Sequence, residues 1–202
     1  PIKISAQRIQ SSLKSKTKVN LDFFDSCSNT IIRQVNNIEN LVSEFSNFAR
    51  MPESKLELTK LDNIINTQVN TQKIANKNIT FNIKMNPKNI NIRCDYNQIS
   101  RLIMNVLKNS IESIKKKKKI IHINVMHKNK MIHIDIEDNG VGFPNNREKL
   151  FEPYITNKAN GTGLGLAICK KIVEDHNGQI ELLDSELLGG AMVRIKFFLK
   201  IK

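Results

Sequence analysis

The chain has 202 residues, of which 40% are hydrophobic, and its formal net charge is +13. This composition allows one or two globular domains and excludes a largely disordered chain, and no apolar run approaches the roughly 20 residues of a membrane-spanning helix. Three cysteines without CxxC spacing favour a reducing compartment over a disulfide framework or a zinc site.

The positive charge raises the question of nucleic-acid binding, because clustered lysines and arginines bind phosphate backbones. The one dense run is residues 115–119, five consecutive lysines between a helical pattern and a strand pattern. An aromatic content of 5% provides no stacking platform around this run. The lysines therefore indicate a solvated loop, and no nucleic-acid partner is expected.

Two helices in a hairpin are predicted for the N-terminal part, residues 1–51. Apolar residues recur there at intervals of four and three, at Ile2, Ala6, Ile9 and Leu13 and again at Ile31, Val35, Ile38, Val42, Phe45 and Ala49. A connecting stretch at residues 16–25 breaks the pattern. Each stripe is too narrow to be buried by the other, so we expect two copies to form a four-helix bundle. The alternative is an N-terminal extension packed on the domain that follows.

A second domain is predicted for residues 52–202, because Pro52 ends the helical pattern and residues 51–55 have the composition of a short linker. Strands are expected at 56–61, 79–85, 89–94, 121–125, 132–136, 179–184 and 191–199, and helices at 62–76, 95–114 and 162–176. A turn at 128–130 joins two strands, and residues 143–160 are expected to be irregular. This order predicts an α/β sandwich with helices on one face of a mixed sheet.

Two glycine-containing loops dominate the second domain. Asp138-Asn139-Gly140-Val141-Gly142 follows a strand, and Gly161-Thr162-Gly163-Leu164-Gly165 opens a helix. Glycines allow the backbone to approach phosphate oxygens closely, and a helix N-terminus offers free N–H donors to the same anion. Together the loops predict a bound nucleotide.

Polar side chains on the helix at 95–114 form a narrow arc that can line a cleft. Arg101, Asn105, Asn109 and Glu112 fall on one side of this helix, opposite a broad apolar face. A carboxamide oxygen suits Mg²⁺, which takes few protein ligands in addition to substrate phosphates, and Asn109 is the candidate ligand. In an asparagine-rich chain, a solvated helix face is the alternative.

Asp138 is the candidate for reading a purine base. A carboxylate fixed at the end of a strand can accept a hydrogen bond from the exocyclic amine of adenine, whereas guanine has a carbonyl at that position. Taken alone, Asp-Asn-Gly is also a common turn sequence.

Four motifs in order resemble the conserved boxes of bacterial sensor histidine kinases. They are Asn105-Val-Leu-Lys-Asn109-Ser, Asp138-Asn-Gly-Val-Gly142-Phe, Phe151-Glu-Pro and Gly161-Thr-Gly-Leu-Gly165-Leu. Residues 1–50 are similar to the dimerisation and histidine-phosphotransfer hairpin of that family, and residues 1–8 resemble the NtrY type. The fold implied is a helical hairpin, paired into a dimeric four-helix bundle, followed by a histidine-kinase-like ATPase domain.

The resemblance implies a transmitter core that uses Mg·ATP to phosphorylate a histidine and then a response-regulator receiver domain. It assigns Mg²⁺ to Asn109, phosphate or metal to Asn105, and adenine to Asp138. Gly140 and Gly142 would shape the base pocket, and residues 143–160 would form a lid with Lys158 near the phosphates. Gly161, Thr162, Gly163, Leu164 and Gly165 would bind the phosphates. The protein would be a homodimer, the cytoplasmic part of an inner-membrane protein.

The resemblance also implies that the phosphoacceptor histidine precedes Pro1, because the first 121 residues contain no histidine. His176, close to Gly178 at a helix end, is expected to cap that helix. His122 and His133 alternate with apolar strand residues and are expected to face outward.

Other functions stay open at this point. The chain could be a non-catalytic dimeric adaptor that binds ATP, or another ATPase of the same fold, such as an anti-sigma-factor serine kinase. The heptad hairpin argues against the second alternative.

Overall fold

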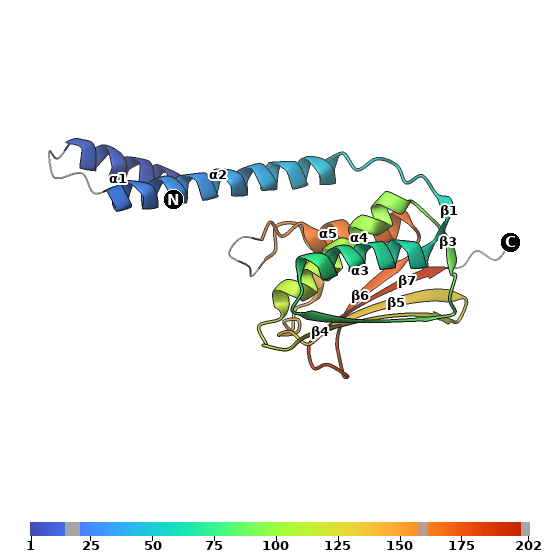
Figure 1. Cartoon of the computed structure of the whole chain (residues 1–202). Coiled ribbons are helices and arrows are strands. Elements are labelled where there is room, and N and C mark those ends of the chain that lie inside the picture. Colours follow the sequence, from blue (N-terminus) through green and yellow to red (C-terminus); the bar gives the residue numbers. More distant parts are fainter. Residues whose placement is uncertain (15–20, 157, 159–160, 199–202) are drawn as a thin grey trace. The chain divides into compact units, whose positions relative to one another are not determined.

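The computed structural model describes residues 1–14, 21–156, 158 and 161–198. These residues divide into two compact units (Figure 1). The first comprises Pro1–Met51 with Lys158, Gly161 and Thr162, and the second comprises residues 52–156 and those from Gly163 onward. No helix in this described part is long and apolar enough to cross a membrane.

The N-terminal unit consists of α1 (Ile2–Lys14) and α2 (Leu21–Ala49), which pack against each other. The Arg8 guanidinium lies 5.2 Å from the centre of the Phe23 ring. The connecting stretch is expected at residues 16–25, and its predicted C-terminal boundary is wrong because α2 already begins at Leu21. Asp22 in the first turn favours this earlier start, since a negative charge there complements the helix dipole. Residues 15–20 lie outside the described residues.

The apolar stripe of α2 is largely exposed within one chain. Val35, Ile38, Val42 and Phe45, spaced three and four residues apart, have exposed fractions of 39–59%. A single hairpin therefore leaves this heptad stripe uncovered.

The second unit contains the predicted strands and helices in the predicted order. They are β1 (Glu57–Lys60), α3 (Leu61–Ala75), β2 (Ile79–Asn86), β3 (Asn91–Cys94), α4 (Tyr96–Ser113), β4 (Lys119–Lys128), β5 (Met131–Asp138), α5 (Gly165–Asp175), β6 (Gln179–Asp184) and β7 (Ala191–Phe198). A short 3₁₀ helix, η1 (Glu148–Phe151), lies in the stretch expected to be irregular.

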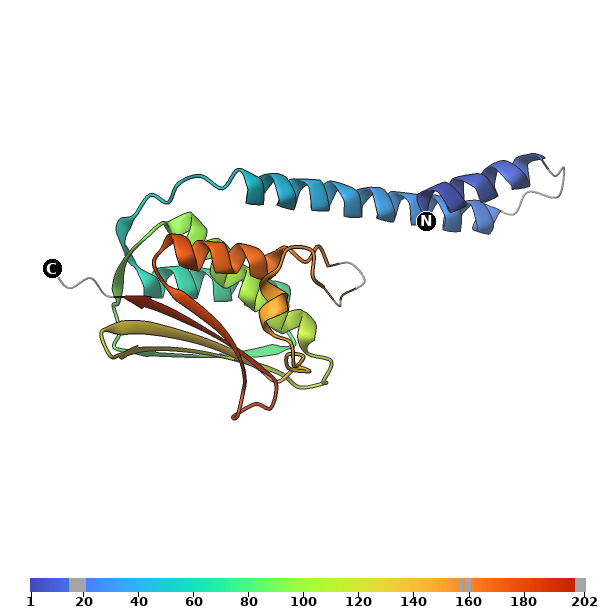
Figure 2. The ribbon, with the colours of Figure 1, turned by 180° about the vertical axis from the view of Figure 1, so that it is seen from behind.

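Five strands form one sheet in the order β2-β4-β5-β7-β6, in which β2 and β4 are parallel and the other pairs are antiparallel. Strands β1 and β3 form a separate two-stranded sheet. Helices α3, α4 and α5 cover one face of the large sheet (Figures 1 and 2). The predicted α/β sandwich with a mixed sheet is therefore confirmed for this unit.

Alternation along the central strands places their apolar side chains under the helices. Ile121, Ile123 and Val125 of β4 are at most 1% exposed, as are Ile132, Ile134 and Ile136 of β5. The predicted turn at 128–130 is confirmed, since Asn129 and Lys130 have φ angles of 54° and 60°, which suit a two-residue hairpin turn.

The opposite face of the sheet is polar, and ion pairs link neighbouring strands there. Arg194 of β7 donates two hydrogen bonds of 2.8 Å to the buried carboxylate of Asp135 on β5, directly across the strand pair. These hydrogen bonds raise the pKa of Arg194. His122 and His133 point to this face, as expected, and His122 contacts Asn82 at 2.9 Å. The pKa of His133 is lowered, chiefly by burial.

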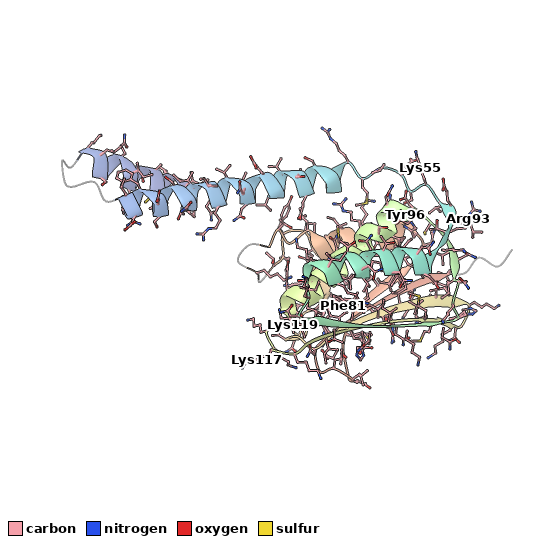
Figure 3. The ribbon with its side chains drawn as sticks, viewed as in Figure 1. Lys55, Phe81, Arg93, Tyr96, Lys117 and Lys119 are labelled. Carbon is pink, nitrogen blue, oxygen red and sulfur yellow. The ribbon has the colours of Figure 1, made fainter. Side chains whose placement is uncertain are left out.

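The segment after the hairpin, residues 52–55, is fastened to the first turn of α4 (Figure 3). The buried Gln98 side chain donates to the Pro52 carbonyl at 3.1 Å and accepts from Ser54 Oγ at 2.9 Å. Asp95, the N-cap of α4, accepts from the backbone N–H groups of Gln98 and Lys55, both at 3.0 Å. The start of α4 is therefore also the attachment point of the linker.

The Asp95 carboxylate has a lowered pKa. Burial alone would raise it, but the backbone N–H donors of Gln98 and Lys55 outweigh that effect. A carboxylate with a lowered pKa stabilises the fold fully above its usual pKa of about 3.9, and this contribution is lost as the pH falls through the lowered value.

We expect Asp95→Ala to reduce the free energy of unfolding by about 1 kcal/mol at pH 7, because the N-cap and linker hydrogen bonds are lost. The difference from wild type should shrink as the pH falls below about 4, because the unfolded wild-type chain then takes up a proton at Asp95 before the folded protein does. Urea unfolding followed by circular dichroism at several pH values measures both effects. The exposed Glu186→Ala is the control, and an Asp95→Ala deficit that does not vary with pH would contradict this assignment.

Candidate nucleotide-binding site

Asp138 is the last residue of β5 and is only 2% exposed. It lies on the inward face of β5 with Ile132, Ile134 and Ile136. The same alternation that buries these apolar side chains therefore also buries the Asp138 carboxylate. Its Oδ1 atom accepts from Gly140 N at 2.8 Å, Ser113 Oγ at 3.1 Å and Ala191 N at 3.4 Å. These donors come from three separate parts of the chain and hold the carboxylate in one orientation.

Two glycines are required around Asp138 because nothing larger fits. A Cβ atom on Gly140 would lie 2.1 Å from Ser113 Oγ and 2.7 Å from Asp138 Oδ1. A Cβ atom on Gly190 would lie 2.2 Å from the Asp138 carbonyl oxygen and 2.6 Å from Gly140 N. Gly142 differs, since its φ of +76° rather than lack of space favours glycine there.

Asn139 joins this loop by hydrogen bonds to the C-terminal end of the lysine run at residues 115–119. Its side chain accepts from Ile120 N and donates to the Lys118 carbonyl, both at 2.9 Å. Figure 3 shows Lys117 and Lys119 where the run leads into β4. Phe81, labelled in the same view, is 8% exposed and offers no open ring for stacking on a base.

The predicted polar arc of α4 lies partly buried and includes Asn105 and Asn109. Asn105 lies beside the buried Cys169 thiol of α5, which donates to the Leu102 carbonyl at 3.9 Å. Burial raises the pKa of this thiol to about 12, and the neighbouring Asn105 offsets part of this rise. Asn109 Nδ2 lies 3.9 Å from the position that a Gly165 Cβ atom would occupy. The arc therefore faces the N-terminal part of α5.

The second glycine loop forms the approach to α5. This helix begins at Gly165 and not, as expected, at Thr162. Gly163 has a φ of +69°, and its carbonyl accepts from Tyr154 N at 3.1 Å, so the chain is still turning there. Leu164 is fully buried and anchors the first turn through the bond from Ile168 N to its carbonyl.

The structure thus brings Asp138, Gly140, Gly142, Asn105, Asn109, Gly163, Leu164 and Gly165 into the α/β unit. Lys158, Gly161 and Thr162 fall in the other compact unit, where Gly161 N donates to the Lys158 carbonyl at 3.1 Å. Their expected role beside the phosphates stays a prediction. Residues 157, 159 and 160 of the expected lid lie outside the described residues.

The donors present fit a nucleotide-bound Mg²⁺ ion rather than a metal held by the protein alone. Among the described residues, no group of three His, Cys, Asp or Glu side chains could hold a metal ion. A carboxamide such as Asn109, next to the N-terminus of α5, instead suits an ion whose remaining ligands are phosphates and water.

His176 has a structural role. It is the C-cap of α5, where its Nδ1 donates to the Ile172 carbonyl at 2.7 Å and its Nε2 accepts from Asp95 N at 3.0 Å. The predicted capping role is confirmed.

Comparison with known proteins agrees with this geometry. The model of the histidine kinase-, DNA gyrase B- and HSP90-like ATPase family matches residues 94–201, more than half of the chain. The chain belongs to this ATPase family. Within it, the sequence groups with sensor histidine kinases of the NtrY type.

The nitrogen regulation protein NtrY of Azorhizobium caulinodans is 36% identical over 96% of this chain and 26% of its own length. A putative NtrY-like sensor histidine kinase of Rickettsia bellii is 36% identical over 99% of the chain and 33% of its own length. The chain therefore spans about a quarter to a third of these relatives.

Solved structures show the same fold. The catalytic domain of the histidine kinase ThkA superposes with a TM-score of 0.63 at 27% identity, covering 71% of this chain and 95% of that domain. ThkA in complex with the response regulator TrrA gives a TM-score of 0.75 at 21% identity, covering 98% of this chain and 57% of ThkA.

Sequence reasoning missed three residues around Asp138: Ser113, Asn139 as a link to the lysine run, and Gly190. The Gly189-Gly190 pair was a visible signal for a close backbone approach. Ser113 gave none, because a serine at a helix end is common and its contact with β5 is tertiary.

The two adjacent glycines provide a matched test of the close packing. We expect Gly190→Ala to lower the free energy of unfolding by about 1–3 kcal/mol through overpacking, and to weaken ADP binding about tenfold or more by displacing Asp138. A Cβ atom on Gly189 has no neighbour within 4 Å, so Gly189→Ala should lower the free energy of unfolding by roughly 1–2 kcal/mol through the φ of +70° alone. Its ADP affinity should equal that of wild type. Thermal unfolding and calorimetric titration distinguish the two, and equal ADP affinities would show that Gly190 does not support the base pocket.

Proposed function

We propose that this chain binds Mg·ATP in its α/β unit and serves as the transmitter core of an NtrY-type sensor histidine kinase. Residues 1–51 are the dimerisation and phosphotransfer hairpin, and residues 52–202 are the ATP-binding domain. The observation that carries the proposal is the buried Asp138 carboxylate, whose Oδ1 accepts hydrogen bonds from three donors within the protein.

The arrangement of those donors supports adenine recognition. Among the described residues, every donor recorded at Asp138 reaches Oδ1, and none reaches Oδ2. In the described part of the structure Oδ2 is not a fully buried oxygen without a partner. It is therefore within reach of a donor from outside the protein, and the exocyclic N–H of adenine supplies one. Guanine would oppose its carbonyl oxygen to this acceptor, so ATP is preferred over GTP.

The phosphate end of the site is assigned to α4 and α5. The backbone N–H groups in the first turn of α5 have no acceptor within that helix and lie at the positive end of its dipole, and Gly163 and Gly165 allow close approach to phosphates. Asn109 provides the carboxamide ligand for Mg²⁺, and Asn105 contacts phosphate or metal. From the resemblance to sensor histidine kinases we infer that Lys158, Gly161 and Thr162 also contact the phosphates. The ion supplies charge neutralisation during phosphoryl transfer.

Phosphoryl transfer to a histidine and then to an aspartate requires a protein longer than these 202 residues. We infer that a histidine outside residues 1–202 accepts the γ-phosphate and passes it to an aspartate of a receiver domain, in a cytoplasmic part of a membrane-anchored sensor. The complex of ThkA with a response regulator supports this class of partner. The exposed stripe of α2, from Val35 to Phe45, supports a homodimer, because a second hairpin would bury it.

Substitutions at the two ends of the site should have different effects. Asp138→Asn should weaken ADP binding by about tenfold to a hundredfold with or without Mg²⁺, since it replaces a charged acceptor of hydrogen bonds. Asn109→Ala should bind ADP like wild type in a chelating buffer but lose the gain in affinity that Mg²⁺ gives. Calorimetry with and without Mg²⁺ measures both, with the exposed Glu186→Gln as control. Wild-type titrations for both variants would eliminate the proposed roles.

Phosphoryl transfer is tested with γ-labelled ATP. The longer protein should incorporate an acid-labile label on histidine, and Asp138→Asn should abolish it. Residues 1–202 alone should bind nucleotide and acquire no stable label. Labelling of this chain by itself would place the acceptor inside it and overturn that part of the proposal, whereas nucleotide binding without any labelling of the longer protein would indicate a non-catalytic adaptor.

A further inference from the structure

Ser113 is the only side chain that the structure records as a donor to Asp138 among the described residues. The other two donors, Gly140 N and Ala191 N, are backbone groups and would persist with any residue that fits there. Ser113 is the last residue of α4, so this bond joins the end of that helix to the end of β5. It is the one contact at the carboxylate that a change of side-chain chemistry can remove.

The Ser113 hydroxyl has one proton and two acceptors within reach. Its Oγ lies 2.8 Å from the Ser110 carbonyl and 3.1 Å from Asp138 Oδ1. The Ser110 carbonyl is among the last four of α4, which have no partner inside the helix. A carboxylate is the stronger acceptor, because hydrogen bonds to an ionised group are roughly twice as strong as neutral ones. The hydroxyl therefore can be a donor to Asp138 or a simple helix cap, and these two roles make different predictions.

The packing around Ser113 favours the first role. The position of a Gly140 Cβ atom would be 2.1 Å from Ser113 Oγ and 2.7 Å from Asp138 Oδ1, so the hydroxyl, the carboxylate and the glycine backbone meet in one tight cluster. The three donors converge on Oδ1 and resist rotation of the carboxylate about its Cβ–Cγ bond. Oδ2 is thereby kept directed away from them.

We propose that Ser113 is a positioning residue for base recognition, which orients the Asp138 carboxylate so that Oδ2 accepts the exocyclic amine of adenine. This inference rests on the proposed nucleotide site and adds the residue that sets its selectivity. Binding is preorganised by this bond, since the carboxylate does not have to find its orientation when the base enters.

The test compares ADP with purine riboside diphosphate, which lacks the 6-amino group but is otherwise the same ligand. Wild type should bind ADP at least tenfold more tightly than the analogue. Ser113→Ala should weaken ADP binding about fivefold to tenfold, as expected for a hydrogen bond to a charged group. The analogue should bind both proteins equally, so that the ADP preference largely disappears. Ser113→Thr keeps a hydroxyl and should keep the preference.

A matched control lies on the same helix. Ser100 Oγ is the buried side-chain oxygen for which the described part of the structure shows no hydrogen-bond partner, so Ser100→Ala removes the same group without removing a contact. Its ratio of ADP to analogue affinity should equal that of wild type.

The outcomes separate the two levels of inference. If wild type binds ADP and the analogue equally, Asp138 does not read the amine and the proposed adenine site fails. If wild type discriminates and Ser113→Ala discriminates equally well, the site stands and the role of Ser113 is overturned in favour of a helix cap. If Ser113→Ala weakens both ligands by the same factor, the hydroxyl supports the pocket as a whole, and the positioning role is likewise overturned.

Discussion

The hydrogen bonding of one buried carboxylate organises the part of the α/β unit where we propose the nucleotide site. Asp138 has an exposed fraction of 2%, and a charge at that depth is tolerated only when hydrogen bonds replace the lost water. Those bonds come from the end of α4, the loop after β5 and the start of β7. The carboxylate therefore fixes the relative positions of three elements that are distant in sequence, and the elements in turn fix the carboxylate.

Close packing around Asp138 explains the residue types nearby better than backbone conformation does. Gly140 and Gly190 lie where any Cβ atom would collide with backbone atoms or with the carboxylate itself. The backbone N–H of Asn139 still donates to the Ile120 carbonyl, at 3.3 Å, and its side chain adds hydrogen bonds to Lys118 and Ile120. These bonds extend the same constraint to the start of β4. The lysine run is thus held at its C-terminal end by the loop after β5, although its side chains are mostly exposed.

Much of this fold follows from local pattern. Alternation in β4 and β5, a polar turn at Asn129 and the position of Asp138 at a strand end could all be predicted, because side-chain direction in a strand is fixed by its period of two. The start of α5 could not. The sequence pattern predicts a helix from Thr162, but the hydrogen bond between Tyr154 and Gly163 keeps the chain turning there, and the helix begins at Gly165. Ser113 and Gly190 escaped prediction for the same reason, since each matters through an atom brought near by folding.

Helix α4 connects features that would otherwise be unrelated. Its first turn holds residues 52–55 through Asp95 and Gln98, its middle carries Asn105 and Asn109, and its last residue donates to Asp138. Eighteen residues span about 27 Å, and a buried face packed on both α3 and α5 makes such a helix stiff. A displacement of residues 52–55 therefore either breaks the hydrogen bonds of Gln98 and Asp95 or moves α4 as a whole, together with the proposed metal ligand Asn109 and the proposed positioning residue Ser113. Residues 52–55 and the proposed nucleotide site are thus attached to the same helix.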